Sequence, residues 1–102
     1  MDRLPLLRQM AAARADDPFP RYGLAMELVK RGEGDEAEAV FQTLLADHPN
    51  YVPSYLMFGN LLVERGKRPE AAHVLDQGIE AATRASDEHS LSELQAARAE
   101  LT

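Results

Sequence analysis

The sequence predicts an all-α fold built from antiparallel helix pairs, and three observations support this prediction. Apolar residues recur at helical spacing through most of the 102-residue chain. Short breaks that contain glycine or proline separate these stretches. One segment of the chain also repeats after 34 residues with no insertion or deletion. A repeat of this length is typical of folds in which helix pairs stack on one another.

The repeat overlays residues 52–85 on residues 18–51. Identical residues meet where Leu62, Val63, Arg65, Gly66, Glu70, Ala71 and Val74 fall on Leu28, Val29, Arg31, Gly32, Glu36, Ala37 and Val40. Residues of like character meet where Phe58, Gly59, Leu75 and Ile79 fall on Leu24, Ala25, Phe41 and Leu45. Because the period determines which helices become neighbours, it is a stronger guide to the fold than local helix propensity.

The first half of the chain is predicted to hold three helices. The first spans Asp2–Ala15, and Pro5 lies in its first turn, where the missing N–H costs little. The second runs from about Pro20 to Arg31, and we expect Gly32 to end it in a left-handed conformation. The third begins after Asp35 as N-cap and stops before a proline at position 49. Its apolar positions, expected to be buried, are Ala37, Val40, Phe41, Leu44 and Leu45.

Three more helices are predicted in the second half. The fourth spans Pro53–Arg65 and is apolar on nearly all sides, so we expect it to be covered on more than one side. Gly59 is expected where two helices pass close together. Pro69 opens the fifth helix, in which Gly78 indicates another close approach, because glycine costs about 1 kcal/mol of helix propensity against alanine. The capping-box pattern Ser90-x-x-Glu93 predicts the start of the sixth helix.

The composition favours a soluble globular protein and excludes several functional classes. Apolar residues make up 45% and charged residues 27% of the chain. The absence of cysteine excludes disulfides and thiolate zinc sites. A net charge of −6 argues against nucleic acid or an anionic membrane as a partner. There is neither a basic-then-apolar leader nor an apolar run of about 18 residues, so we expect a cytoplasmic protein.

The repeated segment resembles a tetratricopeptide repeat. The later copy carries the pattern Tyr55-x-x-Phe58-Gly59-x-x-Leu62 followed by Ala71-x-x-x-Leu75. The earlier copy is similar, with Leu24-Ala25-x-x-Leu28, Ala37-x-x-x-Phe41 and Pro49. The sequence departs from the family pattern at Arg21, where an aromatic residue is usual, at Leu44, where a small residue is common, and at Thr83, which replaces the closing proline.

The resemblance implies a single all-α, TPR-like solenoid domain over residues 1–102. Residues 1–17 would form an N-terminal helix, 18–51 and 52–85 the two repeats, and 86–102 a C-terminal capping helix. A helix pair cannot bury its apolar face alone, and about three units are normally needed for stability. We therefore expect the two flanking helices to cover the ends of the two-repeat array.

The resemblance also implies a binding surface, because the first helix of each pair lines the concave side in this family. The residues placed there are Tyr22, Met26, Val29, Lys30, Leu56, Asn60, Val63 and Glu64. They predict an apolar groove for a peptide or helix of a partner protein, with Asn60 able to bond a peptide backbone. Two alternatives stay open: the same side chains could associate two copies into a homodimer, or pack on one another.

The clamp that some family members use for acidic chaperone tails is not expected here. Tyr22, Met26 and Met57 occupy places where that clamp has polar side chains, and the net negative charge does not suit an acidic tail. The spacing His73-x-x-Asp76 provides only two metal ligands, which suggests a solvated surface pair rather than a metal site. We therefore predict a non-enzymatic protein-interaction module without cofactor or metal; the alternative is a self-associating structural protein without a separate client.

Overall fold

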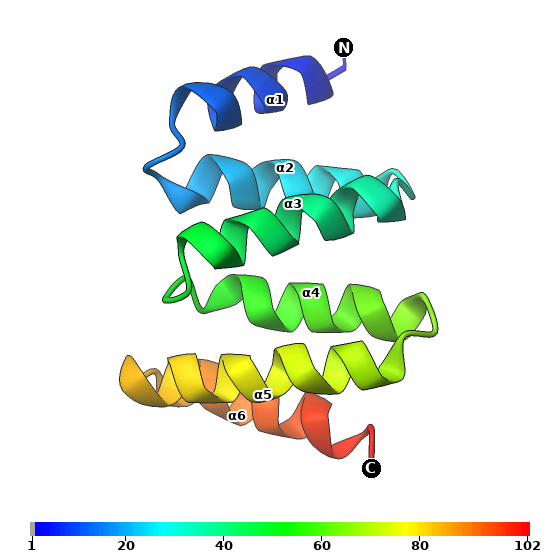
Figure 1. Cartoon of the computed structure of the whole chain (residues 1–102), viewed down its shortest axis with the longest axis vertical. Coiled ribbons are helices and arrows are strands. Elements are labelled where there is room, and N and C mark those ends of the chain that lie inside the picture. Colours follow the sequence, from blue (N-terminus) through cyan, green and yellow to red (C-terminus); the bar gives the residue numbers. More distant parts are fainter. Residues whose placement is uncertain (1) are drawn as a thin grey trace. The chain divides into compact units, whose positions relative to one another are not determined.

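The computed structural model describes residues 2–102 and forms six α-helices, with no strand in that range (Figure 1). The helices are α1 Leu4–Ala13, α2 Pro18–Lys30, α3 Gly34–Asp47, α4 Pro53–Glu64, α5 Arg68–Arg84 and α6 Glu88–Ala99. Met1, which belongs to the predicted first segment, lies outside the described residues. The prediction of an all-α fold with six helices is confirmed.

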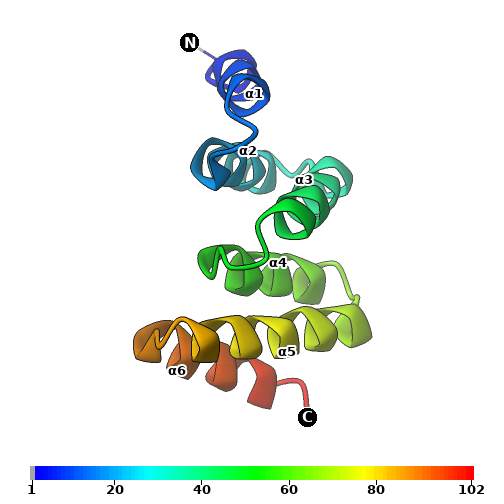
Figure 2. The same cartoon turned by 60° about the vertical axis from the view of Figure 1, so that its left-hand side comes forward.

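The contacts divide the chain into two compact units, Met1–His48 and Pro49–Thr102. In the first unit, α2 packs against both α1 and α3. In the second unit, α4 and α5 form an antiparallel pair, and α6 packs against both of them (Figure 2). The organisation of the whole chain into one domain stays a prediction.

The 34-residue period of the sequence reappears in the backbone. Helix α2 ends at Lys30 and α4 at Glu64, while α3 begins at Gly34 and α5 at Arg68. Between them, Gly32 and Gly66 adopt left-handed conformations with φ of 77° and 76°. Each glycine N–H and the N–H after it donate back into the preceding helix, at 2.8–3.0 Å, in the pattern of a Schellman turn. The predicted left-handed end of α2 at Gly32 is therefore confirmed.

A third left-handed turn ends α5, and here the residue is Ser86. Its φ is 55°, and the N–H groups of Ser86 and Asp87 donate to Thr83 and Ala82 in the same pattern as at the two glycines. A residue with a Cβ is strained in this region. This left-handed turn was not predicted from the sequence, because serine does not indicate a left-handed helix end as glycine does.

The structure corrects two predicted helix caps. Helix α3 begins at Gly34, so Asp35 lies inside its first turn and is not the N-cap. Helix α6 begins at Glu88, and the Asp87 carboxylate accepts a hydrogen bond from the backbone N–H of Ser90 at 3.1 Å. The capping box predicted at Ser90 is therefore wrong. The aspartate lies three residues earlier and offers a charged acceptor, which makes a stronger hydrogen bond than a hydroxyl does.

An aspartate also sets the start of α2. The Asp17 carboxylate accepts a hydrogen bond from the N–H of Phe19 at 3.0 Å, so α2 begins at Pro18 rather than near Pro20. Helix α1 is shorter than predicted, and Pro5 lies in its first turn as expected.

The core of the first unit is centred on α2 and α3. Leu24, Ala25 and Leu28 of α2 and Ala37, Phe41 and Leu44 of α3 are buried, and Ala11 contributes from α1. Val40 and Leu45 are only half-buried, contrary to the expectation for α3, whereas Glu38 is buried. The helical spacing of α3 therefore predicted the centre of its buried face correctly, but the predicted face was wider than the one in the structure.

Arginine side chains join the elements of the first unit. Arg21 donates from Nη1 to Asp47 Oδ2 at 2.7 Å and to the carbonyl of Thr43 at 3.2 Å, and from Nη2 to the carbonyl of Ala15 at 3.2 Å. Its side chain is only 13% exposed. The arginine that replaces the usual aromatic residue therefore connects α2, α3 and the turn after α1, which a ring could not do by hydrogen bonding.

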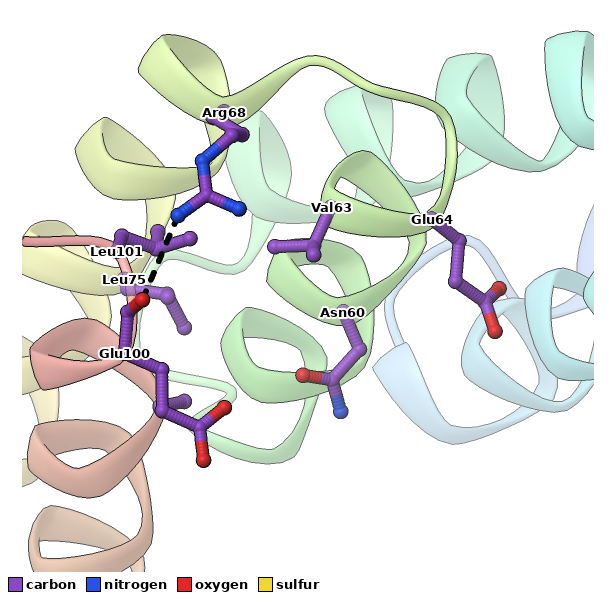
Figure 3. Close-up of a pocket in the computed structure, with 8 residues that line it drawn as sticks. Asn60, Val63, Glu64, Arg68, Leu75, Glu100 and Leu101 are labelled. Carbon is purple, nitrogen blue, oxygen red and sulfur yellow. Dashed lines mark hydrogen bonds between the residues drawn. The ribbon is translucent and has the colours of Figure 1, made fainter.

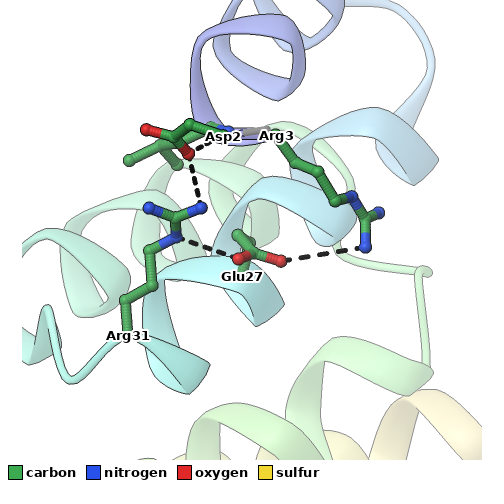
Figure 4. A network of polar contacts seen from close by, with 5 residues as sticks. Asp2, Arg3, Glu27 and Arg31 are labelled. Atoms are coloured by element: carbon green, nitrogen blue, oxygen red, sulfur yellow. Dashed lines mark hydrogen bonds and ion pairs between the residues drawn. The ribbon is translucent and has the colours of Figure 1, made fainter.

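A second arginine ties the segment before α1 to the end of α2 (Figure 4). Arg31 donates from Nε to Glu27 Oε2 at 2.9 Å and from Nη2 to the Asp2 carboxylate. Arg3 approaches the other oxygen of Glu27 at 4.0 Å. The hydrogen bond from the Leu4 N–H, together with Arg31, lowers the pKa of the Asp2 carboxyl. Hydrogen bonds between Arg8 and Glu36 add a link from α1 to α3.

The second unit depends on two glycines at close helix contacts. A Cβ on Gly59 would lie 2.6 Å from Cδ2 of Leu75, so α4 and α5 can approach there only because no side chain intervenes. A Cβ on Gly78 would lie 2.5 Å from Cβ of Tyr55 and 2.9 Å from Cδ2 of Leu94. Gly78 is therefore the point where α4, α5 and α6 meet. Both close approaches predicted from the sequence are present.

Candidate protein-interaction site

The predicted binding residues of the first unit form one stripe along α2. Tyr22, Met26 and Val29 recur at helical spacing and are half-buried, while Lys30 is exposed at the end of the helix. Partial burial raises the pKa of the Tyr22 hydroxyl, so this group stays protonated at neutral pH. The stripe is separate from the buried face of α2 formed by Leu24 and Leu28.

The predicted binding residues of the second unit form an equivalent stripe along α4. Leu56 is half-buried, whereas Asn60, Val63 and Glu64 are exposed. Val63 is 36% exposed, which is unusual for a large aliphatic side chain in this protein. A scattered exposed apolar residue is ordinary, but this one borders a depression in the surface.

That depression is a cleft of about 390 Å³ in the second unit (Figure 3). It is lined by Asn60, Val63 and Glu64 of α4, Arg68 and Leu75 of α5, Ala97 of α6, and Glu100 and Leu101 beyond α6. Three of the four residues predicted on α4 thus share one cleft, and the fourth, Leu56, does not line it. Its volume falls within the range of small-ligand pockets.

The cleft has an apolar middle and a polar rim. The side chains of Val63, Leu75 and Leu101 supply the apolar part. Arg68 Nη2 donates to the main-chain carbonyl of Glu100 at 3.4 Å, across one end of the cleft (Figure 3). The Glu100 carboxylate extends away from Arg68 toward the side where Asn60 lies. The cleft therefore combines an apolar surface with polar groups at its edges.

The wall of the cleft that lies outside α4 was not predicted, although the sequence carries a signal for part of it. Moving Val63 forward by another 34 residues reaches Ala97, so α6 continues the register of α2 and α4. Arg68, Leu75, Glu100 and Leu101 have no such signal, because their approach to Val63 depends on how α5 and α6 pack.

A further apolar surface lies on the first unit. Leu6 and Met10 on α1 are 58% and 45% exposed, and Phe19 at the start of α2 is 66% exposed. Leu4, Leu7 and Ala11 form the opposite, more buried side of α1. Helix α1 is therefore apolar on both sides, which was not predicted.

The His73 and Asp76 spacing does not build a metal site. His73 is exposed, and Asp76 Oδ1 accepts a hydrogen bond from Arg98 Nε at 2.9 Å, which connects α5 to α6. Within residues 2–102, no group of three histidine, cysteine or acidic side chains is arranged to hold a metal ion. No helix in the same range is long and apolar enough to cross a membrane.

Two antiparallel helix pairs in a 34-residue register define a helical-repeat protein. A tetratricopeptide repeat family model matches the chain twice, over residues 4–57 and 28–101. The chain belongs to the tetratricopeptide repeat family. Repeats of this family form a non-enzymatic scaffold and generally mediate protein–protein interaction.

Solved structures agree with this assignment. The chain is similar to a tetratricopeptide repeat domain protein from Salinibacter ruber in a solution structure, with 36% identity and a TM-score of 0.80, covering 83% of this chain and 86% of that one. The chain is also similar to a tetratricopeptide repeat domain protein from the same organism in a crystal structure, with 36% identity and a TM-score of 0.79, covering 83% of this chain and 96% of that one.

A protein from Bordetella parapertussis shares the fold at a TM-score of 0.82 and 24% identity, covering 99% of this chain and 88% of that one. At this identity, the likeness supports the fold alone. Among curated proteins, none matches the chain.

Proposed function

We propose that the chain is a protein-interaction module that binds a peptide or helical segment of a partner through the side chains of α2 and α4. On α2 the contacts would come from Tyr22, Met26, Val29 and Lys30, and on α4 from Leu56, Asn60, Val63 and Glu64. Helices are well suited to this task, because their backbone groups are satisfied internally and their side chains present a fixed surface.

The observation that carries the proposal is the cleft beside α4. Asn60, Val63 and Glu64 line it together with residues of α5 and α6, so the second unit offers a concave surface with an apolar middle. Val63 is exposed in the cleft, and Tyr22 and Met26 are only half-buried on α2. A few anchor residues, with tyrosine prominent among them, provide most of the binding energy in protein interfaces.

A second candidate function, self-association, is favoured by a different surface. Leu6 and Met10 leave α1 with an apolar outer side, and the exposed Phe19 follows in the same unit. A second copy of the chain could cover these side chains. Replacement of Leu6 and Met10 by serine would then convert a dimer into a monomer in light scattering, while the variants of α2 and α4 described below would keep the mass of the dimer.

The proposal is tested with the double variant Tyr22→Ser plus Leu56→Ser. Both residues lie off the buried faces of their helices, so we expect the helical content to be retained. Partner proteins captured by the wild type from native lysate are identified and purified, and their affinity is then measured for each variant. The matched control is Gln42→Ser plus Gln77→Ser, at exposed positions of α3 and α5. We expect the first variant to lose binding and the control to keep it; equal binding by both would refute the proposal.

A further inference from the structure

The charges around the cleft are not balanced. Arg68 supplies the one cationic side chain among the residues that line it, whereas Glu64 and Glu100 supply two carboxylates. The guanidinium of Arg68 faces the carbonyl of Glu100, at the end of α6. The C-terminal end of a helix carries a partial negative charge, so Arg68 already has a favourable partner there.

The two carboxylates have no such partner. Within the part of the chain that the structure describes, neither Glu64 nor Glu100 forms an ion pair. The Glu100 carboxylate extends away from Arg68, and the Glu64 side chain also points away from Arg68 (Figure 3). Both residues are exposed. The surface around the cleft is therefore left with unpaired negative charge.

The apolar part of the cleft lies between these charged groups. Val63, Leu75 and Leu101 form it, and Leu75 is nearly fully buried beneath the surface. An apolar side chain that entered here would displace water from Val63 and Leu101, which is favourable in proportion to the apolar area covered. A basic side chain next to it on the same segment would reach the carboxylates at the rim.

We propose that the cleft selects a cationic amphipathic segment of the partner protein, in which a large apolar side chain is followed closely by lysine or arginine. This inference rests on the proposed function and specifies the chemistry of its partner. The apolar side chain occupies the space between Val63, Leu75 and Leu101, and the cation lies against Glu100 or Glu64. The net charge of −6 would attract such a segment from a distance and repel an acidic one.

The test is a selection from a random peptide library displayed on phage, with the whole chain as bait. We expect the enriched peptides to combine a leucine, methionine or phenylalanine with nearby lysine or arginine. An enriched peptide is then synthesised, and its affinity is measured for the wild type and three variants. These are Glu64→Gln plus Glu100→Gln, which removes the charges of the cleft, Val63→Ser, which removes its apolar contact, and a charge control.

The charge control is Glu70→Gln plus Glu80→Gln on α5, which changes the net charge equally at exposed residues outside the cleft. We expect the cleft double variant to bind about three- to tenfold more weakly, as for the loss of two solvent-exposed ion pairs, and the control to change affinity much less. Val63→Ser should also weaken binding. Circular dichroism confirms that each variant keeps its fold.

The outcomes separate the two proposals. If the enriched peptides are uncharged or acidic, or if the cleft variant and the control behave alike, then the inference about charge is wrong. In that case the proposed function stands, provided that Tyr22→Ser plus Leu56→Ser still abolishes binding. If no peptide is enriched, or if binding withstands every variant of α2 and α4, then both proposals are contradicted.

Discussion

Replacing Gly78 by alanine tests the packing of the second unit most sharply, because helix propensity and packing predict opposite results. In an open helical position, alanine is favoured over glycine by about 0.8–1.0 kcal/mol. At Gly78, however, the added Cβ would lie 2.5 Å from Cβ of Tyr55, which is fixed to the backbone and cannot rotate away. Helices α4 and α5 would have to separate, and overpacking of this kind costs about 1–3 kcal/mol.

The three interior helical glycines provide a graded series. Gly23 has only Leu7 Cδ2 nearby, at 3.8 Å from the added Cβ, so Gly23→Ala should be stabilising by about 0.5–1 kcal/mol. Gly59→Ala meets Cδ2 and Cγ of Leu75 at 2.6 and 2.9 Å, and the leucine can yield in part, so its effect should be intermediate. Gly78→Ala should be net destabilising, by up to about 2 kcal/mol after the gain in propensity is subtracted.

Chemical denaturation followed by far-UV circular dichroism measures the three free energies of unfolding. A difference of 1 kcal/mol corresponds to a shift of about 4–8 °C in melting temperature for a domain of this size, which thermal unfolding would resolve. If Gly78→Ala stabilised the protein as much as Gly23→Ala, then α4, α5 and α6 would not meet as closely as described, and the reasoning would be refuted.

Four further predictions follow from individual contacts. Ser86→Gly should raise the free energy of unfolding by about 1 kcal/mol because it relieves the left-handed strain at φ 55°, and unchanged thermal stability would contradict this. Arg21→Lys should lower the free energy of unfolding by about 1–3 kcal/mol, because lysine keeps the charge but cannot make the forked hydrogen bonds to Asp47 and two carbonyls. An unaltered denaturation midpoint would show that these hydrogen bonds do not stabilise the fold. Leu94→Ala should cost about 2–5 kcal/mol and expose the apolar surface of α5, because Leu94 is 1% exposed; a stable, monomeric variant in light scattering would show that α6 is not a cap. Hydrogen bonds from Ser90 lower the pKa of the Asp87 carboxyl, so its stabilising effect is present above about pH 4 and lost as the pH falls through the lowered folded-state pKa. The difference in melting temperature between wild type and Asp87→Ala should therefore shrink in acid, and a constant difference would exclude this assignment.

Much of the fold could be predicted because its determinants are local or periodic. The 34-residue register fixed the turns at Gly32 and Gly66, since glycine is the residue that best tolerates positive φ there. Gly59 and Gly78 indicated close helix contacts, because a helix keeps glycine at a cost of stability only where space requires it.

The helix caps were predicted wrongly where several neighbouring residues are able to cap the same helix. Asp87, Ser90 and Asp35 are all suitable helix caps, and only the backbone path decides which carboxylate or hydroxyl reaches an unpaired N–H. Ser86 carried no sign of its left-handed conformation, because the turn is imposed by the helices on either side.

The candidate site could be predicted on α4 but not across the cleft. The family register identified Asn60, Val63 and Glu64, which depend only on the face of one helix. Leu101 joins them through the packing of α6 against α4 and α5, although it lies more than thirty positions further along the chain. Such contacts follow from side-chain packing that a single sequence does not specify.

Chemical-shift mapping tests the central claim most directly, namely that the chain binds a partner through α2 and α4. The ¹⁵N-labelled protein is titrated with a peptide from the display selection, and the amide shifts are followed to saturation. We predict that the largest changes fall on Met26, Leu56, Val63 and Leu101, with smaller changes on Ala97. Changes confined to the outer positions of α3 and α5, such as Gln42 and Gln77, or to Leu6 and Met10 on α1, would contradict the account.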